Sequence, residues 1–284
     1  MEINQFSLCY LTRPWTDPVE FLAAAADAGF GMASMFIRSG TGRPLPFEIM
    51  GNAERLRAIR SLCARSGLRV FDAEAIVLDP AVDLDVIDPV LDTASQLGAT
   101  YVTCVGNEIA REGDHSRNDG HIEKLAIIGE RAARYGLQIG VEFMRYRDIP
   151  TLQEATKLID ASGQSNIGVI IDVLHLHRTQ GLAAQVAALD PARIISVQLS
   201  DAPATSPAFE NLADEARSGR LHLGDGVIPL REILAAIPEG VPIAIEVPVA
   251  DDRELSAREC ALKAAASIRN QPDIFNVKRR SLSG

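Results

Sequence analysis

The sequence is poor in the residues that mark several common protein classes. It has 4 cysteines, Cys9, Cys63, Cys104 and Cys260. Because they are scattered and none forms a CxxC pair, they do not resemble a disulfide framework or a structural zinc site. We expect reduced, mostly buried thiols. Hydrophobic runs are also short, since the run from Phe21 to Ala26 stops at Asp27, well below the ~18–20 residues of a membrane span.

Positive charge is scarce as well. Lys and Arg number 28 against 38 Asp and Glu, which gives a formal net charge of −10. No Lys/Arg-rich stripe interrupts this acidic surface, which would repel phosphate backbones and anionic lipids. We therefore expect neither a nucleic acid nor a membrane as a partner. The first residues, Met-Glu-Ile-Asn-Gln, lack the basic and apolar regions of a signal peptide, so the expected location is cytoplasmic.

Short apolar runs alternate with amphipathic stretches from one end of the chain to the other. The runs predict strands at Phe6–Leu11, Met32–Ile37, Arg69–Ala75, Tyr101–Val105, Gln138–Phe143, Gly168–Asp172, Ile194–Leu199 and Ile243–Val247. The amphipathic stretches predict helices at Pro18–Ala28, Ala53–Ser66, Val86–Leu97, Ile122–Tyr135, Leu152–Ser162 and Arg253–Arg269. Several of these helices are followed by a glycine where a helix commonly ends, namely Gly29, Gly67, Gly98, Gly136 and Gly163.

This alternation predicts an α/β protein, a single-domain (β/α)₈ TIM barrel. Eight units in about 270 residues give ~34 residues each, which suits a barrel of roughly 250 residues. A doubly wound open sheet is the alternative, because alternation alone does not prove closure. We assign residues 1–270 to the barrel and 271–284 to a C-terminal tail, expected to be loosely held. The longest irregular stretch, about 200–227, would lie over the active-site face.

Four polar residues interrupt the last four predicted strands near their C-terminal ends. They are Glu142, Asp172, Gln198 and Glu246. Strands of a parallel barrel are buried, so a carboxylate inside one is costly unless a charge compensates it. The C-terminal mouth is also where barrel enzymes place their chemistry. Three carboxylates converging there would raise each other's pKa unless a cation lies between them.

A divalent metal ion would resolve that repulsion. Four oxygen donors without His or Cys favour Mg²⁺ or Mn²⁺, with Co²⁺ also acceptable and Zn²⁺ less favoured. The alternative is that each residue is an isolated strand-end polar group satisfied by nearby backbone. Because the four lie on consecutive strands, we prefer one metal ion bound by Glu142, Asp172, Gln198 and Glu246.

Five stretches carry a family resemblance: VEF at 141–143, NIGVIIDVLHLHR at 166–178, VQLSDAP at 197–203, GDG at 224–226 and AIEVP at 244–248. Together they resemble the sugar phosphate isomerase/epimerase family, the xylose isomerase-like TIM barrels. This resemblance implies that the four strand-end residues bind one catalytic divalent metal. Many sugar epimerases of the family have His where this chain has Gln198, and Gln there is similar to the dehydroshikimate dehydratases.

The resemblance implies a metal-dependent isomerase or epimerase of a small polyhydroxylated carbonyl compound, a sugar, sugar phosphate or inosose. The metal would stabilise an enediolate. Glu142 and Glu246 would remove and return the proton on opposite faces of the substrate. Barrels of this family are often dimers or tetramers, which allows a homo-oligomer here.

Further residues are candidates for contact with the substrate. His175 lies three residues after Asp172 and would donate a proton or orient a hydroxyl, although it could instead cap the following helix. Arg220, before the GDG turn, resembles the family's substrate-binding arginine. Arg145 would suit an anionic group, and Glu74 would bind a hydroxyl or form an internal salt bridge.

Three other functions stay open at this point. A lyase would expel water from the same enolate, and Gln198 and the arginines favour that branch. Endonuclease IV shares the fold family, but its three-zinc cluster needs several additional His ligands, and only three of the 5 histidines here lie near the predicted mouth. A barrel subunit without catalysis is the third, and the intact set of four predicted ligands argues against it.

Overall fold

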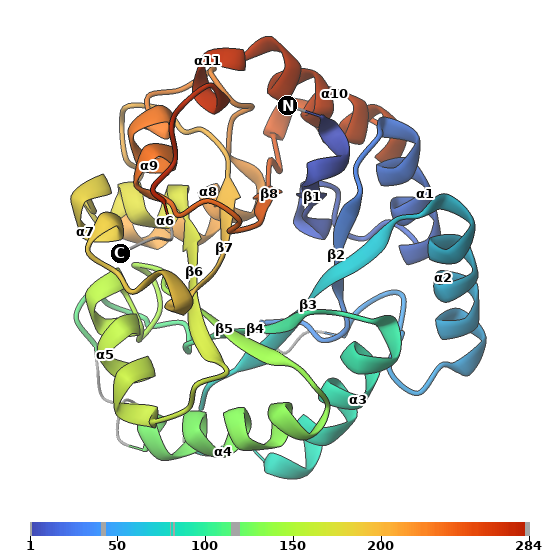
Figure 1. The fold of residues 1–284 in the computed structure, drawn as a ribbon, viewed down its shortest axis with the longest axis vertical. Helices are drawn as coiled ribbons and strands as arrows, with labels where there is room; N and C mark the ends of the chain where they lie inside the picture. The colour runs from blue at the N-terminus through green and yellow to red at the C-terminus, as the bar shows by residue number, and fades with distance from the viewer. Residues whose placement is uncertain (1, 41–43, 80, 82, 115–119, 282–284) are drawn as a thin grey trace.

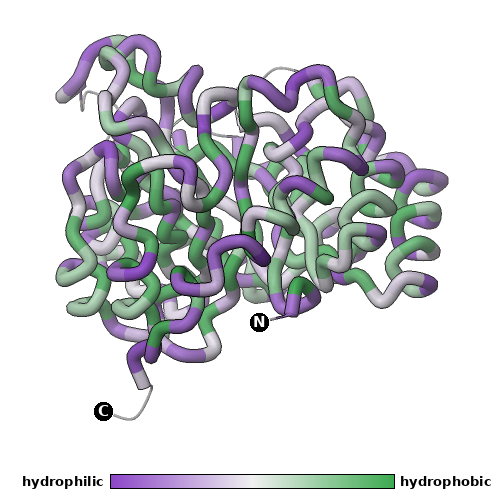
Figure 2. The backbone as a smooth tube through the Cα atoms, turned by 90° about the horizontal axis from the view of Figure 1, so that it is seen from above, coloured by the Kyte–Doolittle hydropathy of each residue, from purple (hydrophilic) through white to green (hydrophobic). Residues whose placement is uncertain are grey.

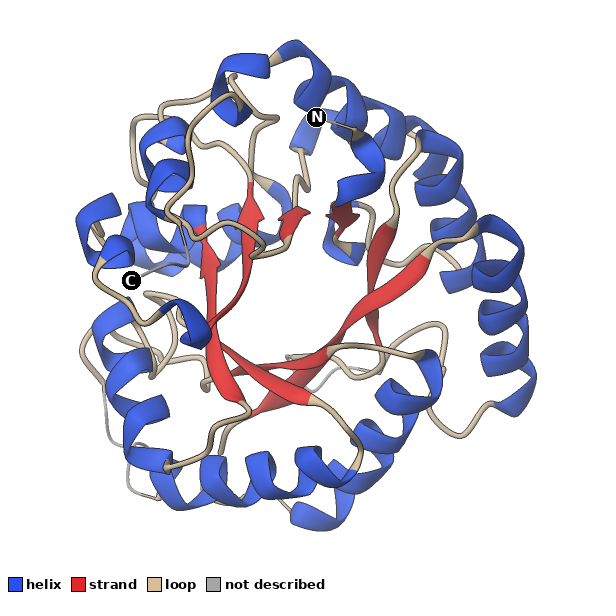
Figure 3. Ribbon diagram, in the orientation of Figure 1, coloured by secondary structure: helices blue, strands red, loops and turns tan. Residues whose placement is uncertain are grey.

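Eight parallel strands close into a barrel in the order of the sequence (Figures 1 and 3). The computed structural model describes residues 2–40, 44–79, 81, 83–114 and 120–281. The strands are β1 Phe6–Leu8, β2 Met32–Phe36, β3 Arg69–Val77, β4 Tyr101–Val105, β5 Gln138–Glu142, β6 Ile167–Asp172, β7 Ile194–Leu199 and β8 Ile243–Ile245. Because β1 pairs with both β2 and β8, the sheet has no edge. The predicted TIM barrel is confirmed, and the open sheet is excluded.

Helices surround this barrel as an outer layer (Figure 3). They are α1 Pro18–Ala28, α2 Ala53–Ser66, α3 Ile87–Leu97, α4 His121–Arg134, α5 Leu152–Ser162, α6 Val173–Arg178, α7 Ala183–Ala187, α8 Leu212–Ser218, α9 Leu230–Ala236, α10 Ala257–Asn270 and α11 Pro272–Phe275. Hydrophobic and hydrophilic segments alternate along the whole tube (Figure 2), because each repeat buries one face and exposes the other. No helix in the described part of the chain is long and apolar enough to cross a membrane.

Local sequence signals set the helix ends. The Asp17 carboxylate accepts a hydrogen bond from the Val19 amide at 2.9 Å, and Gly29 ends α1 with a φ of 95°, which glycine adopts without strain. Ser256 and Glu259 form a capping box that starts α10 at Ala257. This helix was predicted to start at Arg253, but the preceding residues form a 3₁₀ turn at Ala250–Asp252.

The stretch expected to be irregular, 200–227, contains helix α8 and a 3₁₀ turn at Phe209–Asn211. Asp201 and Leu221 exchange backbone hydrogen bonds of 2.9 and 2.8 Å, which close the loop at its base. The Asp201 carboxylate also accepts bonds from the Ala202, Gly224 and Ile228 amides. The short helix α8 therefore lies over the barrel in a loop whose base is fixed by these hydrogen bonds. Helix α8 brings Arg217 to the mouth, and Arg220 follows it closely in the chain.

The C-terminal segment differs from the expectation that it is loosely held. Phe275 in α11 packs edge-on against Phe6 of β1, with ring centroids 5.2 Å apart. Arg279 donates to the Pro238 and Val241 carbonyl oxygens at 2.6 and 2.9 Å, and Arg280 pairs with Pro238. These contacts satisfy backbone carbonyls after α9, so the described part of the segment belongs to the packed structure.

The barrel interior changes from apolar to polar along its axis. Near the strand starts, a small cluster contains Met32, Phe71, Tyr101, Ile170 and Ile195. The Tyr101 hydroxyl lies 2.9 Å from the Ser196 Oγ, and because β4 and β7 are not neighbours, this bond crosses the interior. A Cβ at Gly140 would lie 3.1 Å from the Tyr101 ring, so the glycine makes room for it. The strand starts are thereby closed, and a cavity is left only toward the strand ends.

Asp72, in the middle of β3, is a buried carboxylate that the sequence did not single out. It is 0% exposed, and neither of its carboxylate oxygens has a hydrogen-bond partner in the described structure. Burial raises its pKa from 3.8 to about 7. The charged form of Asp72 therefore destabilises the fold at neutral pH.

Replacing Asp72 with Asn is expected to flatten the dependence of stability on pH. The folded protein holds the Asp72 proton more tightly than the unfolded chain, so its contribution is favourable at low pH and is lost as pH rises from about 4 to about 7. At ~1.4 kcal/mol per pH unit this loss amounts to ~4 kcal/mol at most. Urea unfolding at pH 5 and pH 8 measures it. Asp92→Asn, on the exposed side of α3, should keep the wild-type slope, and an equal slope in Asp72→Asn would contradict the argument.

Candidate active site

A cavity of about 320 Å³ opens at the C-terminal end of the barrel. Its lining includes Glu74, Glu142, His175, Arg220 and Glu246, all of them predicted site residues. They come from β3, β5, the start of α6, the segment after α8, and the residue after β8. Glu74 and Glu246 are 172 positions apart in the sequence. They meet in one cavity because parallel strands end at the same rim of the barrel.

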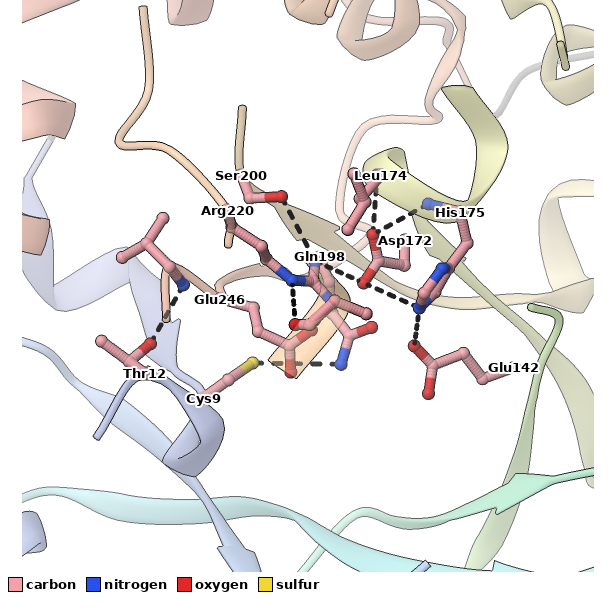
Figure 4. Close-up of polar contacts among 12 residues, drawn as sticks. Cys9, Thr12, Glu142, Asp172, Leu174, His175, Gln198, Ser200, Arg220 and Glu246 are labelled. Atoms are coloured by element: carbon pink, nitrogen blue, oxygen red, sulfur yellow. Dashed lines mark hydrogen bonds and ion pairs between the residues drawn. The ribbon is translucent and has the colours of Figure 1, made fainter. Parts of the chain in front are cut away.

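Glu142, Asp172 and His175 form the tightest group of potential metal ligands. One ligand atom from each lies within 4.8 Å of the others, and all three residues are buried. The His175 Nε2 is 3.8 Å from Glu142 Oε1 and 3.8 Å from Asp172 Oδ2 (Figure 4). Glu246 is not part of this three-residue group.

Asp172 is oriented by the helix that follows it. It ends β6 and is the N-cap of α6, so its Oδ1 accepts hydrogen bonds from the Leu174 amide at 2.7 Å and the His175 amide at 3.4 Å. This cap fixes the carboxylate and leaves Oδ2 facing Arg220 and His175. The cap also brings the ring of His175, three residues later, back to the same carboxylate. The DxxH spacing is thus a consequence of a strand running directly into a helix.

Arg220 joins two of the predicted ligands. Its Nη1 is 2.7 Å from Asp172 Oδ2, and its Nη2 is 2.6 Å from Glu246 Oε2. Nη1 also donates to Ser200 Oγ at 3.2 Å and Nε donates to the Ala216 carbonyl oxygen at 2.9 Å. Since Arg220 is only 2% exposed, this guanidinium is a fixed positive charge between two buried carboxylates (Figure 4). It was predicted to bind substrate, and it reaches the cavity as part of this network.

Burial controls the protonation of these groups. It raises the pKa of Glu246 to about 8, against the opposing effect of Arg220. It also raises the pKa of Glu142, which the carboxylates of Glu246 and Asp172 raise further. Burial is the largest effect on Asp172 and would raise its pKa, but Arg220, His175 and the hydrogen bonds to its carboxylate together lower it. For His175, burial lowers the pKa to about 4, so at neutral pH it is a neutral imidazole, the form that binds metals.

Gln198 has one side-chain oxygen that is available as a metal ligand. Its Nε2 lies 3.9 Å from Cys9 Sγ, a weak contact, while its Oε1 is buried and has no partner in the described structure. A buried amide oxygen without a partner is costly, and a cation would satisfy it. The donor set therefore fits a divalent metal. It differs in one respect from the expected four oxygens, because His175 adds a nitrogen. Imidazole suits Zn²⁺, whereas the oxygen donors suit Mg²⁺ and Mn²⁺.

Glu74 lies in the cavity, as predicted. Its Oε1 accepts a hydrogen bond from the Ser34 Oγ at 3.0 Å, and Ser34 in turn accepts one from the Tyr10 amide at 2.7 Å. Burial raises the pKa of Glu74, and the Asp72 and Glu246 carboxylates raise it further. A hydroxyl group of a ligand could hydrogen-bond to this carboxyl. The salt bridge considered from the sequence does not form in the described structure.

Arg145 lies outside the cavity, in contrast to the sequence expectation. Its Nε donates to Glu112 Oε1 at 2.6 Å and its Nη1 donates to the Arg178 carbonyl oxygen at 3.3 Å. Three other arginines line the cavity instead: Arg38, Arg147 and Arg217. In the sequence, Arg147 follows the same strand as Arg145, and Arg217 lies with Arg220 before the GDG turn, but no motif distinguished Arg38. Only the loop conformations decide which of these side chains enters the cavity.

The family model that describes the xylose isomerase-like TIM barrel matches residues 22–270. The chain belongs to this family. Its members include enzymes of the isomerase, epimerase and dehydratase types, so the resemblance seen in the strand-end motifs is confirmed. The match begins within α1 and includes the cavity-lining residues from Phe36 to Glu246.

Two kinds of curated relatives are similar to this xylose isomerase-like chain. A 3-dehydroshikimate dehydratase of Pseudomonas putida is 26% identical over 227 residues, 77% of this chain and 33% of that protein. An inosose isomerase of Halalkalibacterium halodurans is 26% identical over 183 residues, 62% of each chain. The chain thus spans about a third of the length of the dehydratase. Among solved structures, the IOLI protein with a binding zinc atom has a TM-score of 0.80 at 17% identity, covering 96% of this chain and 98% of that one.

Removing the Arg220 charge is expected to destabilise the metal-free protein strongly. Arg220→Gln leaves Asp172 and Glu246 buried without a counter-charge, which costs ~3–5 kcal/mol. Urea unfolding in EDTA measures the loss. Arg217→Gln is the matched control, because its pair with Glu108 is more than a third exposed and is worth ~0–1 kcal/mol. Equal stability of the two variants would show that Arg220 does not compensate the buried carboxylates of Asp172 and Glu246.

Proposed function

We propose that this chain is a divalent-metal-dependent isomerase or epimerase of a small polyhydroxylated carbonyl compound, a sugar, sugar phosphate or inosose. The observation that carries the proposal is the buried group of Glu142, Asp172 and His175, of which Glu142 and His175 line the same cavity as Glu246. A cavity of about 320 Å³ is at the small end of the range for ligand sites, which suits a molecule of this size. The relatives named inosose isomerase support the same class.

The metal would be held by Glu142, Asp172, Gln198 and Glu246, with His175 as a further donor beside them. When bound, such an ion polarises a carbonyl group and so lowers the pKa of the neighbouring C–H. Arg220 would keep the Asp172 and Glu246 carboxylates in place through its two ion pairs. Glu74 would hydrogen-bond to a substrate hydroxyl while Ser34 holds its other oxygen.

Proton transfer falls to the two glutamates. Glu142 and Glu246 both line the cavity, and they come from β5 and from the end of β8, which are not neighbours in the barrel. One would take the proton from the carbon beside the carbonyl, and the other would return a proton to the opposite face or to the adjacent carbon. The neutral His175 would donate a hydrogen bond to a substrate oxygen.

A dehydratase is the second candidate, and specific observations favour it. The two dehydratase relatives match 77% and 80% of this chain, and Gln198 resembles that branch. After the same proton removal, the C–O bond of a β-hydroxyl would break, a C=C bond would form, and the hydroxyl would leave as water with a proton from a buried acid. The isomerase and dehydratase mechanisms share every step up to the removal of the proton. A cytoplasmic location and a homo-oligomer stay predictions from the sequence.

The metal site is tested by equilibrium binding. We expect the wild type to bind about one equivalent of Mn²⁺, with thermal stabilisation. Glu142→Gln removes a proposed ligand, so its affinity should fall by more than the ~10–100-fold typical of losing a supporting residue. Glu112→Gln, which pairs with Arg145 outside the cavity, should bind as wild type does. A wild type that binds no metal, or an unchanged Glu142→Gln, would contradict the proposal.

The reaction class is tested by solvent exchange. Wild type saturated with Mn²⁺ and incubated in D₂O with ketoses, inososes and dehydroshikimate should incorporate deuterium beside the carbonyl of its substrate. Glu246→Gln should lower the rate by ~10²–10⁴-fold, the usual contribution of a general acid or base. A product lighter than its substrate by one water, detected by mass spectrometry, selects the dehydratase. Exchange that is as fast in Glu246→Gln as in wild type would remove Glu246 from the mechanism.

A further inference from the structure

The wall of the cavity carries positive charge, in contrast to its floor. Arg38 follows β2, Arg147 follows β5, and Arg217 lies in α8, and all three line the cavity. Arg147 is 5% exposed, whereas the Arg217 side chain is 36% exposed. Three separate segments of the chain thus bring guanidinium groups to the lining of one cavity.

This positive charge is incompletely neutralised. In the described structure, Glu108 is the carboxylate that contacts these arginines. Its Oε1 lies 3.4 Å from Arg147 Nη2 and also accepts from Arg217. No ion pair of Arg38 is found among the described residues. One carboxylate therefore faces three guanidinium groups.

Two guanidinium nitrogens on this wall are also buried without a hydrogen-bond acceptor. They are Arg38 Nη1 and Arg147 Nε, neither of which has a partner in the described residues. The rest of Arg147 is anchored, because Nη1 donates to the Gly106 carbonyl oxygen at 2.5 Å and Nη2 to that of Gly40 at 3.4 Å. A buried charged donor without an acceptor is costly, so these two guanidinium groups are only partly compensated by the protein.

Tyr146 sets the spacing between this wall and the metal-binding group. Its ring lies 5.8 Å from the His175 ring, and the Arg147 and Arg217 guanidinium carbons lie 5.8 and 6.0 Å from the Tyr146 ring centroid. The His175 ring and the guanidinium groups of Arg147 and Arg217 therefore all lie within about 6 Å of the same Tyr146 ring. A compound of five to seven carbons is long enough to reach both.

We propose that the substrate carries an anionic oxygen group, a carboxylate or a phosphate, and that Arg38, Arg147 and Arg217 bind it. The carbonyl and hydroxyl groups at its other end would face Glu142, His175 and Glu246. This inference rests on the proposed function for that second end. Guanidinium groups match the oxygens of carboxylates and phosphates in two-point hydrogen bonds. A neutral sugar would leave the positive charge of the three cavity-lining arginines without a second compensating anion.

Matched pairs of probes test the proposal by calorimetric titration of the Mn²⁺-loaded full chain. D-gluconate is compared with D-glucitol, which lacks the carboxylate, and D-fructose 6-phosphate is compared with D-fructose. In wild type, at least one anion should bind at least tenfold tighter than its neutral partner. The pair that shows this preference distinguishes a carboxylate from a phosphate.

The variant Arg38→Gln should reduce that preference at least tenfold, while Arg134→Gln, an exposed arginine on α4, should keep it. Chelation of the metal by the anion contributes equally in both variants, so it cancels in this comparison. An unchanged thermal shift on adding Mn²⁺ confirms that Arg38→Gln is folded. The proposal is overturned if wild type binds each anion no tighter than its neutral partner, or if Arg38→Gln and Arg134→Gln show equal preferences.

The same experiment separates this proposal from the proposed function. A preference for anions that persists in Glu142→Gln, together with no deuterium exchange in wild type, supports the anion subsite and overturns the enzymatic proposal. Exchange in wild type without any preference for anions overturns the subsite and leaves the enzymatic proposal in place.

Discussion

The ion pairs of Arg220 with Asp172 and Glu246 are the interaction on which the site depends. Carboxylates at the ends of parallel strands are almost completely removed from water, and their charges are tolerable only near a fixed positive charge. The guanidinium is held by backbone and hydroxyl acceptors as well as by the two carboxylates, so it is part of the scaffold. With Arg220 in place, Asp172 stays ionised, and the neighbouring His175 and Glu142 are available to a cation.

The cavity separates charge along its length. Carboxylates are concentrated at the strand ends, where the barrel itself positions them, and guanidinium groups are concentrated on the loops above. This division follows from the architecture, because strand-end residues are fixed by the closed sheet while loop residues vary without affecting it. The proposed metal site belongs to the first region, and the proposed anion subsite belongs to the second.

Sequence reasoning was most successful where the barrel repeats itself. Strands β4 and β7 have the predicted bounds, because short apolar runs between glycine-terminated helices permit little else. It was less successful for α10, whose start was displaced by a 3₁₀ turn, and for the C-terminal segment, whose contacts with Phe6 and Pro238 come from the far end of the chain. Arg145 and Arg147 show the same limit, since two arginines two residues apart follow one strand and only one enters the cavity.

The sequence by itself determined the barrel and the carboxylates at its mouth. Both follow from local patterns: apolar runs of strand length, glycines at helix ends, and a polar residue at the end of each of the last four strands. The tertiary structure alone decided that His175 joins Glu142 and Asp172, that Arg220 bridges Asp172 and Glu246, and that Arg38 faces the cavity. These facts depend on distances between side chains far apart in the sequence, which closure of the sheet and the paths of the loops establish, and which no local pattern encodes.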